Sequence, residues 1–483
     1  MFTSPYENNL FQLQLALSNR EVSAVELTQY YLDQIKAYDG KLCAITNLNP
    51  SALDQAAALD HERAAGTVRS PLHGIPLLIK DNFDLQGMPT TASCAALKES
   101  YPAQDAFVID RLRRAGALFL GKTNLSEFAR HGLTVGSLIG QTHNPYDLTR
   151  TPGGSSGGTG AAIAANLAAA GLGSDTVNSI RSPSSANALV GFRPTTGLLS
   201  RTGIVPCSST QDTGGPITRT VEDAAILLSI CAGYDPKDAA CAPLQNASPI
   251  DYTTFLKEDG LCGKRIGLLR TNFGGDPQVN QAMQRAISIL QQQGAQLVEL
   301  EIPALEAGLV FQMCDVQRYE TKPLLDAYFS SIPNAPVKSL EALVASGKLH
   351  PSIYEDFHAC ASLSNPLEHP DYQKRLSEIA QRKAVAHRWM TEQRLDALCY
   401  PHQQILVVKI GADNQAGRNG IVAAVLGWPA ITVPGGFSAP DETAPIGVPI
   451  GVEFMGLPWQ EGTLLEIAYS FQQAAPQRRP PVL

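Results

Sequence analysis

Two serines and one lysine in this chain have a spacing that could support acyl transfer. Ser155 lies in a glycine-rich run at 152–160, and Ser179 follows an alanine-rich stretch. Lys80 ends a short apolar run far upstream. One serine can attack a carbonyl group, a second hydroxyl can relay the proton, and a neutral lysine can accept it without any histidine. These residue types indicate chemistry through a covalent seryl intermediate.

This chemistry makes demands on the local structure. Lys80 is useful as a base only if burial lowers its pKa, which a position at the end of a buried strand would achieve. Consecutive backbone N–H groups before Ser179 could form an oxyanion hole, and the glycines around Ser155 permit unusual backbone angles. From the pattern alone, two ordinary turns and a surface salt bridge of Lys80 remain an open alternative.

Short apolar runs indicate the elements that would position these residues. Buried strands are predicted at 75–79, 117–121, 265–269, 296–300, 395–401, 430–434 and 447–454, with helices between many of them. Ser23 and Glu26 have the spacing of a capping box at a helix start. Strands that are apolar throughout favour an α/β fold with a mixed, mostly parallel central sheet, covered by helices on both faces.

We expect a single large domain over residues 1–483. Residues 1–66 are predicted to form a helical N-terminal segment, and 67–232 the core that holds the candidate residues. Residues 304–395 are predicted to form a mainly helical cap, inserted before the last core strands.

The composition argues against several classes of protein. Of the 483 residues, 44% are apolar and only 17% are charged, which favours a large interior over a disordered chain. The net charge of −8 and the lack of a long basic run argue against direct nucleic-acid binding. Nine scattered cysteines without a C-x-x-C pair indicate free thiols rather than disulfides or a zinc site. No secretory signal or membrane span is recognisable, so we expect a cytoplasmic protein without membrane contact.

Two segments match familiar motifs whose mechanism does not fit. Residues 116–123 match a phosphate-binding loop, but the middle of the segment is itself a predicted strand, so Lys122 is expected to be structural. Residues 153–157 match the nucleophile elbow of α/β-hydrolases, although a polar loop precedes them instead of an apolar strand. An esterase of that kind would use Ser155 as the nucleophile and a histidine as the base.

The motifs taken together resemble those of the amidase signature family. The Gly-Gly-Ser-Ser-Gly-Gly run at 153–158 is the hallmark of that family. Further matches occur in the family's order at 71–76, 121–128, 144–147, 191–195, 214–216, 219–223 and 427–434. The resemblance covers nearly the whole chain, makes 67–232 the signature core, and is weakest between about 235 and 400.

The resemblance implies an amidohydrolase with a Ser–cis-Ser–Lys triad and without a metal or cofactor. Ser179 would attack the amide carbonyl group. Ser155, preceded by a cis peptide bond from Gly154, would pass the proton to neutral Lys80 and later return it to the leaving nitrogen. Water would then cleave the acyl-enzyme.

The resemblance also implies an oxyanion hole made by the backbone N–H groups of Thr176, Val177, Asn178 and Ser179. This chain departs from the family at Val177 and Asn178, where glycines are usual. The N–H groups are retained. Because valine disfavours positive φ, we expect a negative φ at Val177, and we expect the two side chains to narrow the acyl site.

Candidates for the substrate pocket are Gly153 and Gly154 in the serine run, together with Arg130 and His131, whose segment lines the pocket in similar enzymes. Arg130 could bind a substrate carboxylate or form a structural ion pair. His131 is unnecessary as a base if Lys80 acts.

Other residues are expected to support the loops. Asp175 and Arg181 could pair to hold the nucleophile loop, and Ser156 could cap or orient the serine run. His402 is a further pocket candidate.

The leading functional hypothesis is a stand-alone amidase acting on a small-molecule amide, with a homodimer as a candidate assembly. The alternative is a glutamine-hydrolysing amidotransferase subunit that acts with a partner protein on aminoacyl-tRNA. A third hypothesis, a catalytically inactive binding protein, rests only on Val177 and Asn178. The substrate itself is not predicted, because the cap and pocket loops are where the chain diverges most.

Overall fold

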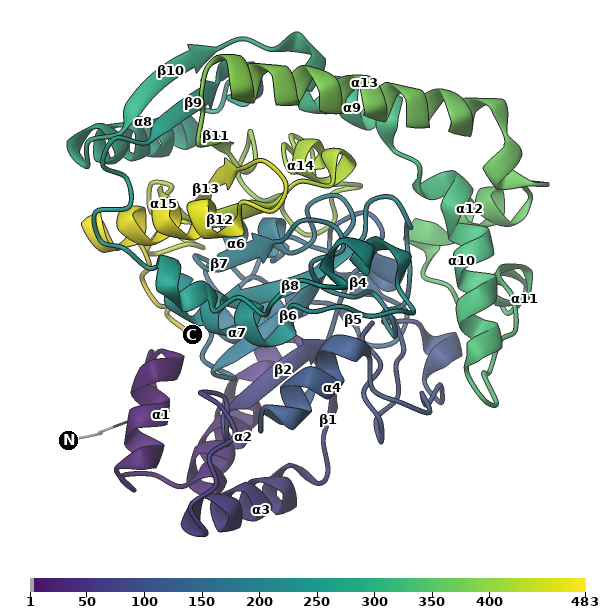
Figure 1. Cartoon of the computed structure of the whole chain (residues 1–483). Helices are drawn as coiled ribbons and strands as arrows, with labels where there is room; N and C mark the ends of the chain where they lie inside the picture. The colour runs from purple at the N-terminus through teal and green to yellow at the C-terminus, as the bar shows by residue number, and fades with distance from the viewer. Residues whose placement is uncertain (1–3) are drawn as a thin grey trace.

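The computed structural model describes residues 4–483 and is built around a large mixed sheet (Figure 1). In spatial order its strands are β1 (Ile45–Leu48), β3 (Leu118–Thr123), β2 (Pro76–Lys80), β6 (Ala170–Asp175), β8 (Thr213–Thr218), β7 (Val190–Arg193), β12 (Ala430–Phe437), β13 (Pro449–Met455), β11 (Ala397–Pro401), β9 (Arg265–Leu269) and β10 (Gln296–Leu300). A separate hairpin joins β4 (Val135–Gly136) to β5 (Gly140–Gln141). The strands predicted from apolar runs are all present.

The sheet is mixed, as predicted, but the expectation of a mostly parallel sheet is wrong. Within residues 4–483, the pairs β3–β2, β2–β6, β11–β9 and β9–β10 are parallel. The other neighbouring pairs are antiparallel. The chain returns from β7 to β8 and from β12 to β13 without an intervening helix, so neighbouring strands run in opposite directions. An apolar run marks a buried strand but carries no information about its direction.

Helices flank the sheet on both faces (Figure 1). They are α1 (Leu10–Ser18), α2 (Ala24–Leu42), α3 (Ala52–Ala64), α4 (Phe107–Arg114), α5 (Gly157–Ala164), α6 (Arg181–Ala186), α7 (Val221–Cys231), α8 (Pro277–Gln292), α9 (Ala307–Cys314), α10 (Gln317–Ser331), α11 (Leu340–Ala345), α12 (Pro351–Ala361), α13 (Pro370–Glu392), α14 (Ile421–Leu426) and α15 (Glu461–Ala474). The predicted capping box is present, since Ser23 and Glu26 each accept the other's backbone N–H at the start of α2.

The N-terminal segment is less purely helical than predicted. Its described part contains α1, α2 and α3, and also the edge strand β1, which pairs antiparallel with β3. This strand is only four residues long and is partly exposed on all of them, so it has no apolar run that would reveal it. Residues 1–3 of the predicted segment lie outside the described residues.

Between β10 and β11 the described chain forms helices and loops only, drawn in green in Figure 1. Helices α10, α11 and α12 share an apolar cluster that includes Phe329, Leu343 and Phe357. Phe128, from the loop after β3, belongs to the same cluster. The helical segment is thereby anchored to a loop of the core that lies close to the candidate site.

The segment that matches a phosphate-binding loop is a strand, as its apolar centre suggested. Lys122 lies within β3, and its buried Nζ pairs with the Asp81 carboxylate at 3.0 Å. Since a buried ion pair occupies this lysine, the geometry supports the structural interpretation.

Candidate active site

Lys80 is the last residue of β2, and its side chain is fully buried. Its Nζ donates to Ser155 Oγ at 2.8 Å, to Ser174 Oγ at 2.9 Å and to the Ser174 carbonyl oxygen at 3.3 Å. Burial lowers the pKa of Lys80 to about 7, even though the negative charge of Asp175 acts in the opposite direction. A lysine with this pKa is neutral often enough near pH 7 to accept a proton.

Ser174 is a member of this cluster that the sequence did not single out. Its Oγ lies between Lys80 Nζ and Asn82 Nδ2, at 2.9 Å from each. Strands β2 and β6 are parallel neighbours, so their carboxyl ends carry Lys80 and Ser174 to the same edge of the sheet. Recognising 170–175 as a strand parallel to β2 would have revealed this contact.

Ser155 is buried just before α5, and the peptide bond from Gly154 to Ser155 is cis. Thr134 holds this run: its Oγ1 donates to the Gly153 carbonyl at 2.7 Å and accepts from the Gly157 N–H at 3.2 Å. The segment before Ser155 is a loop rather than a strand, and its Oγ accepts from a lysine rather than contacting a histidine. The geometry therefore differs from an α/β-hydrolase elbow.

Ser179 lies in the loop between β6 and α6, and its side chain is largely buried. Its carbonyl oxygen accepts the Ser156 N–H at 3.1 Å, which places the nucleophile loop beside the serine run. Ser156 also donates through Oγ to the Ser174 carbonyl at 3.2 Å. Ser155 is thus hydrogen-bonded to Lys80, and the loop of Ser179 is hydrogen-bonded to the serine run.

Backbone N–H groups before Ser179 are available as donors. Within residues 4–483, the N–H groups of Thr176, Val177, Asn178 and Ser179 have no hydrogen-bond acceptor. Neither Val177 nor Asn178 has a positive φ, in agreement with the expectation for the valine. Gln211 holds the loop from outside, since its Nε2 donates to the Thr176 carbonyl at 3.1 Å. Such a row of fixed, unused donors can stabilise a developing oxyanion.

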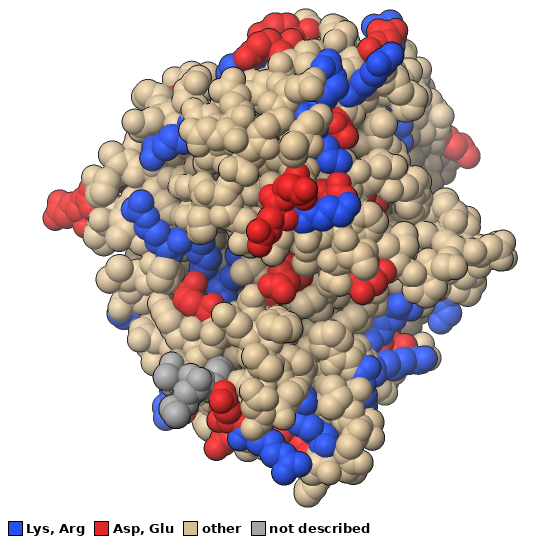
Figure 2. All heavy atoms as spheres, turned by 60° about the vertical axis from the view of Figure 1, so that its left-hand side comes forward, with Lys and Arg blue, Asp and Glu red and all other residues tan. Residues whose placement is uncertain are grey.

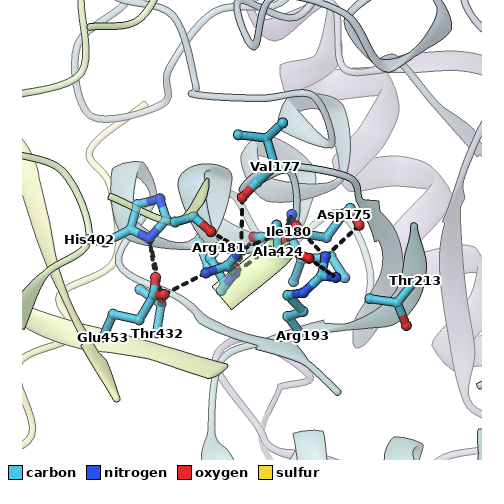
Figure 3. Close-up of polar contacts among 12 residues, drawn as sticks. Asp175, Val177, Ile180, Arg181, Arg193, Thr213, His402, Ala424, Thr432 and Glu453 are labelled. Atoms are coloured by element: carbon cyan, nitrogen blue, oxygen red, sulfur yellow. Dashed lines mark hydrogen bonds and ion pairs between the residues drawn. The ribbon is translucent and has the colours of Figure 1, made fainter. Parts of the chain in front are cut away.

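A buried ionic network anchors the same loop (Figure 3). Arg181 Nε lies 3.1 Å from Asp175 Oδ2, and Arg193 Nη1 lies 2.9 Å from Asp175 Oδ1. Arg181 also pairs with Glu453, which His402 contacts through Nδ1. Burial alone would raise the pKa of Asp175, but the two arginines lower it well below its usual range. The proposed pairing of Asp175 with Arg181 is therefore present, and His402 belongs to this network.

Residues of the nucleophile loop line two cavities. One, of about 180 Å³, is lined by Ser179, Val177 and Asn178 together with Arg130 and His131. The other, of about 440 Å³, is lined by Thr176, Asn82 and Ser174. Helices α9, α10 and α12 supply part of the walls, including Phe311, Gln317 and Asp356 in the smaller cavity and Leu324 and Tyr328 in the larger one. Gly153 and Gly154 line neither of these two cavities and are buried.

Arg130 faces the smaller cavity, but its guanidinium group is already engaged. Nη1 donates to Gln317 at 3.2 Å, Nη2 donates to Thr321, and Nε lies 3.5 Å from Asp356. The group also lies over the ring of Phe357, 5.6 Å from its centroid. This geometry favours the structural alternative for Arg130 over a substrate-binding role.

His131 lines the same cavity and has a left-handed backbone conformation, with φ of 62°. Its buried Nε2 has no hydrogen-bond partner among residues 4–483. Burial lowers the pKa of His131 and outweighs the opposite effect of the Asp356 charge, while the charges of Arg130 and Arg418 lower it further. The imidazole is therefore an uncharged polar group at the cavity wall.

The described residues offer little for other classes of ligand. They contain no group of three or more His, Cys, Asp or Glu side chains that could hold a metal ion. On the face shown in Figure 2, acidic and basic side chains are interspersed rather than gathered by sign. Among the helices of the described chain, none is long and apolar enough to cross a membrane.

An α/β core that holds two serines, a buried lysine with a lowered pKa and unused backbone donors near one another is typical of serine-dependent acyl-transfer hydrolases. The family model described as Amidase matches residues 26–465. The chain belongs to the amidase family and is an amidohydrolase, as its motifs predicted.

Relatives of two kinds match nearly the whole chain. The solved structure of a peptide amidase from Stenotrophomonas maltophilia superposes with a TM-score of 0.90 at 37% identity, covering 99% of each chain. A glutamyl-tRNA(Gln) amidotransferase subunit from Thermoanaerobacter pseudethanolicus is 33% identical over 97% of this chain and 96% of its own length. The solved structure of the same kind of amidotransferase subunit from Thermotoga maritima has a TM-score of 0.76 at 26% identity, covering 99% of this chain and 97% of its own. The curated relatives thus support the amidotransferase alternative better than the stand-alone amidase.

Proposed function

We propose that this chain hydrolyses a carboxylic amide through an acyl-enzyme on Ser179, with Ser155 as the proton relay and Lys80 as the base. The observation that carries the proposal is the 2.8 Å hydrogen bond between Lys80 Nζ and Ser155 Oγ, formed by a lysine whose pKa is about 7. The adjacent N–H groups at 176–179, which have no acceptor among the described residues, give the same proposal its oxyanion hole.

The steps follow from these positions. Ser179 Oγ bonds to the amide carbon while its proton passes through Ser155 to neutral Lys80, and the oxyanion accepts the loop N–H groups. The C–N bond then breaks, and the leaving nitrogen takes the proton back along the same path. Water then attacks the acyl carbon while its proton passes toward Lys80. That proton returns through Ser155 to Ser179 Oγ as the acyl C–O bond breaks, which releases the carboxylic acid and restores Ser179.

A second candidate role is glutamine hydrolysis in an amidotransferase complex. The observation that favours it is the name of the curated relatives, which match nearly the whole of this chain. In that role the amide would be glutamine, and a partner protein would use the released ammonia. The acyl-enzyme chemistry would be the same, so the two roles differ in substrate and in dependence on a partner.

Ammonia release from a panel of primary amides, amino-acid amides and glutamine tests the chemistry. Ser179→Ala, Ser155→Ala and Lys80→Met should each lower kcat/KM by at least about 10⁴-fold, because the three residues act as a unit. Ser288→Ala, an exposed position on α8, is the matched serine control and should retain activity. Full activity of Ser179→Ala would refute the proposal.

The role is tested by comparing the isolated chain with the chain purified together with its cellular partners. Glutamine hydrolysis that appears only in a co-purified complex would establish the amidotransferase role. Rapid hydrolysis of simple amides by the isolated chain, with no gain from a partner, would establish the stand-alone amidase.

A further inference from the structure

The small cavity beside Ser179 contains an arginine with no polar partner. Arg418 lines this cavity, and its guanidinium group forms no hydrogen bond or ion pair with any residue from 4 to 483. It rests on the ring of Phe311, 5.1 Å from the centroid. Burial lowers the pKa of Arg418, but arginine keeps its positive charge at neutral pH. The cavity therefore holds a cation whose hydrogen-bond donors are unused.

The other arginine of the cavity, Arg130, already has polar partners within the described chain. Arg130 uses its nitrogens on Gln317, Thr321 and Asp356. Arg418 is only half-buried, so water can reach its donors in the free enzyme, and an anionic group on a ligand can replace that water. A carboxylate fits a guanidinium group best, since two parallel hydrogen bonds can form.

The position of Arg418 suits contact with a substrate held at Ser179. A Cβ atom built on Gly132 would lie 3.9 Å from Arg418 Nη1 and 3.7 Å from the Gly154 carbonyl oxygen. Gly132 thus lies beside both the guanidinium group of Arg418 and the loop that carries Ser155. Arg418 and Phe311 also line a neighbouring cavity of about 250 Å³, so the pair forms the wall between that cavity and the catalytic one.

Acidic residues limit the charge that the cavity can accept. Asp315 and Asp356 line it as well, and Asp315 raises the pKa of Arg418 although no ion pair forms between them. Asp315 Oδ1 accepts from Gln317 Nε2 at 2.8 Å, which leaves Oδ2 without a hydrogen bond among the described residues. A second negative charge on the ligand would meet these carboxylates, so a single carboxylate is favoured.

We propose that Arg418 binds a carboxylate of the substrate, so that the enzyme prefers amides with one negative charge on the acyl part over neutral amides of the same shape. This inference rests on the proposed function, because it names the substrate class of that site. The sequence suggested Arg130 as a residue that could bind a substrate carboxylate, and we assign this role to Arg418 instead.

Binding is measured first without catalysis. Succinamate, glutaramate and adipamate place a carboxylate at increasing distance from a primary amide, and they are titrated into the Ser179→Ala variant by calorimetry. We expect at least one of them to bind, and Arg418→Gln in the same background to weaken that binding roughly 10- to 100-fold, as for a lost charge-assisted pair. Equal affinity with and without Arg418 would overturn the inference.

Turnover is measured second, with uncharged isosteres in which two methyl groups replace the carboxylate oxygens. The ratio of kcat/KM for the charged amide to that for its isostere should fall roughly 10- to 100-fold in Arg418→Gln. Arg418→Lys keeps the charge and should retain part of the preference. Arg285→Gln, an exposed arginine on α8, is the matched control and should leave the ratio unchanged.

The two measurements separate the two proposals. If binding depends on Arg418 but no amide is hydrolysed, the proposed function is refuted and the carboxylate site is supported. If amides are hydrolysed but the ratio of kcat/KM for the charged amide to that for its isostere is the same in wild type, Arg418→Gln and Arg418→Lys, the carboxylate site is refuted and the proposed function is supported. Because the guanidinium group of Arg418 has no hydrogen bond or ion pair within the described chain, Arg418→Gln should fold, which circular dichroism checks.

Discussion

The low pKa of Lys80 can be tested by placing a carboxylate beside its Nζ. Ser174 Oγ lies 2.9 Å from this atom, and Ser174 also lines the 440 Å³ cavity, which gives a larger side chain room. In Ser174→Asp the two charges would lie about 4 Å apart. At an effective dielectric constant of about 20 they attract by about 4 kcal/mol, which equals about 3 pH units.

The pKa of Lys80 should therefore rise from about 7 toward about 10 in Ser174→Asp. Because only the neutral amine accepts a proton, wild-type kcat/KM should increase as pH rises through about 7. In the variant this rise should move to about pH 10, and activity at pH 7 should fall about 500-fold because the neutral fraction falls from about a half to about one in a thousand.

The assay is a pH profile of kcat/KM from pH 5 to 10.5 for wild type, Ser174→Asp and Ser174→Asn. The asparagine variant has the same shape without the charge, so it controls for the lost hydroxyl group and for steric effects. We expect its profile to rise near the wild-type pH. If the aspartate and asparagine variants rise at the same pH, Lys80 is not the base and the reasoning fails.

Three further substitutions test the supports of the site. Gly154→Ala should lower kcat/KM at least about 100-fold, because its Cβ would lie 2.7 Å from the Gly132 carbonyl carbon and displace the serine run. Arg181→Met should lower the free energy of unfolding in urea by about 3–5 kcal/mol, because buried Asp175 loses a partner. Val177→Gly keeps every N–H donor, so kcat for a small amide should change by less than about tenfold.

Matched positions serve as controls for these substitutions. A Cβ on Gly275 meets nothing within 4 Å, so Gly275→Ala should keep full activity. Arg114 forms an exposed pair with Asp110, and Arg114→Ala should cost less than about 1 kcal/mol. Three results would contradict the structural argument. The first is wild-type activity in Gly154→Ala, and the second is a free energy of unfolding of Arg181→Met that is no lower than that of Arg114→Ala. The third is a 100-fold loss of kcat in Val177→Gly.

Features of the fold that depend on local sequence were predictable. Apolar runs located β2, β3 and the late core strands, and the spacing of Ser23 and Glu26 located the start of α2. The apolar middle of 116–123 also correctly indicated that this segment is a strand and not a phosphate-binding loop. These features follow from burial and from capping, which act within a few residues.

Strand β6 shows why other features were not predictable. Its sequence is rich in alanine and glycine, a composition that is untypical of strands. The structure explains the glycine at 171, because a Cβ there would lie 2.5 Å from Thr159 Cγ2 and 2.9 Å from the Leu78 carbonyl oxygen. The constraint comes from α5 and β2, which are distant in sequence, so no local pattern reveals it.

In the candidate site, too, some residues were predictable from the sequence and others were not. The motifs named Lys80, Ser155 and Ser179. The structure shows a hydrogen bond between Lys80 and Ser155 and another between the loop of Ser179 and the serine run. The catalytic role of each residue is a proposal. The motifs also drew attention to Arg130, whose Nη1 and Nη2 donate to Gln317 and Thr321. Arg418 belongs to no motif and reaches the cavity from a loop near the end of the chain, so only the tertiary structure shows it beside Ser179.

The most direct test of the central claim is to identify the residue that forms the covalent intermediate. A fluorophosphonate probe labels an activated serine, and peptide mass spectrometry of the labelled chain locates the adduct. We expect one adduct, on Ser179, and its loss in Ser179→Ala and in Lys80→Met. An adduct on Ser155 instead, or equal labelling of the Lys80→Met variant, would contradict the account.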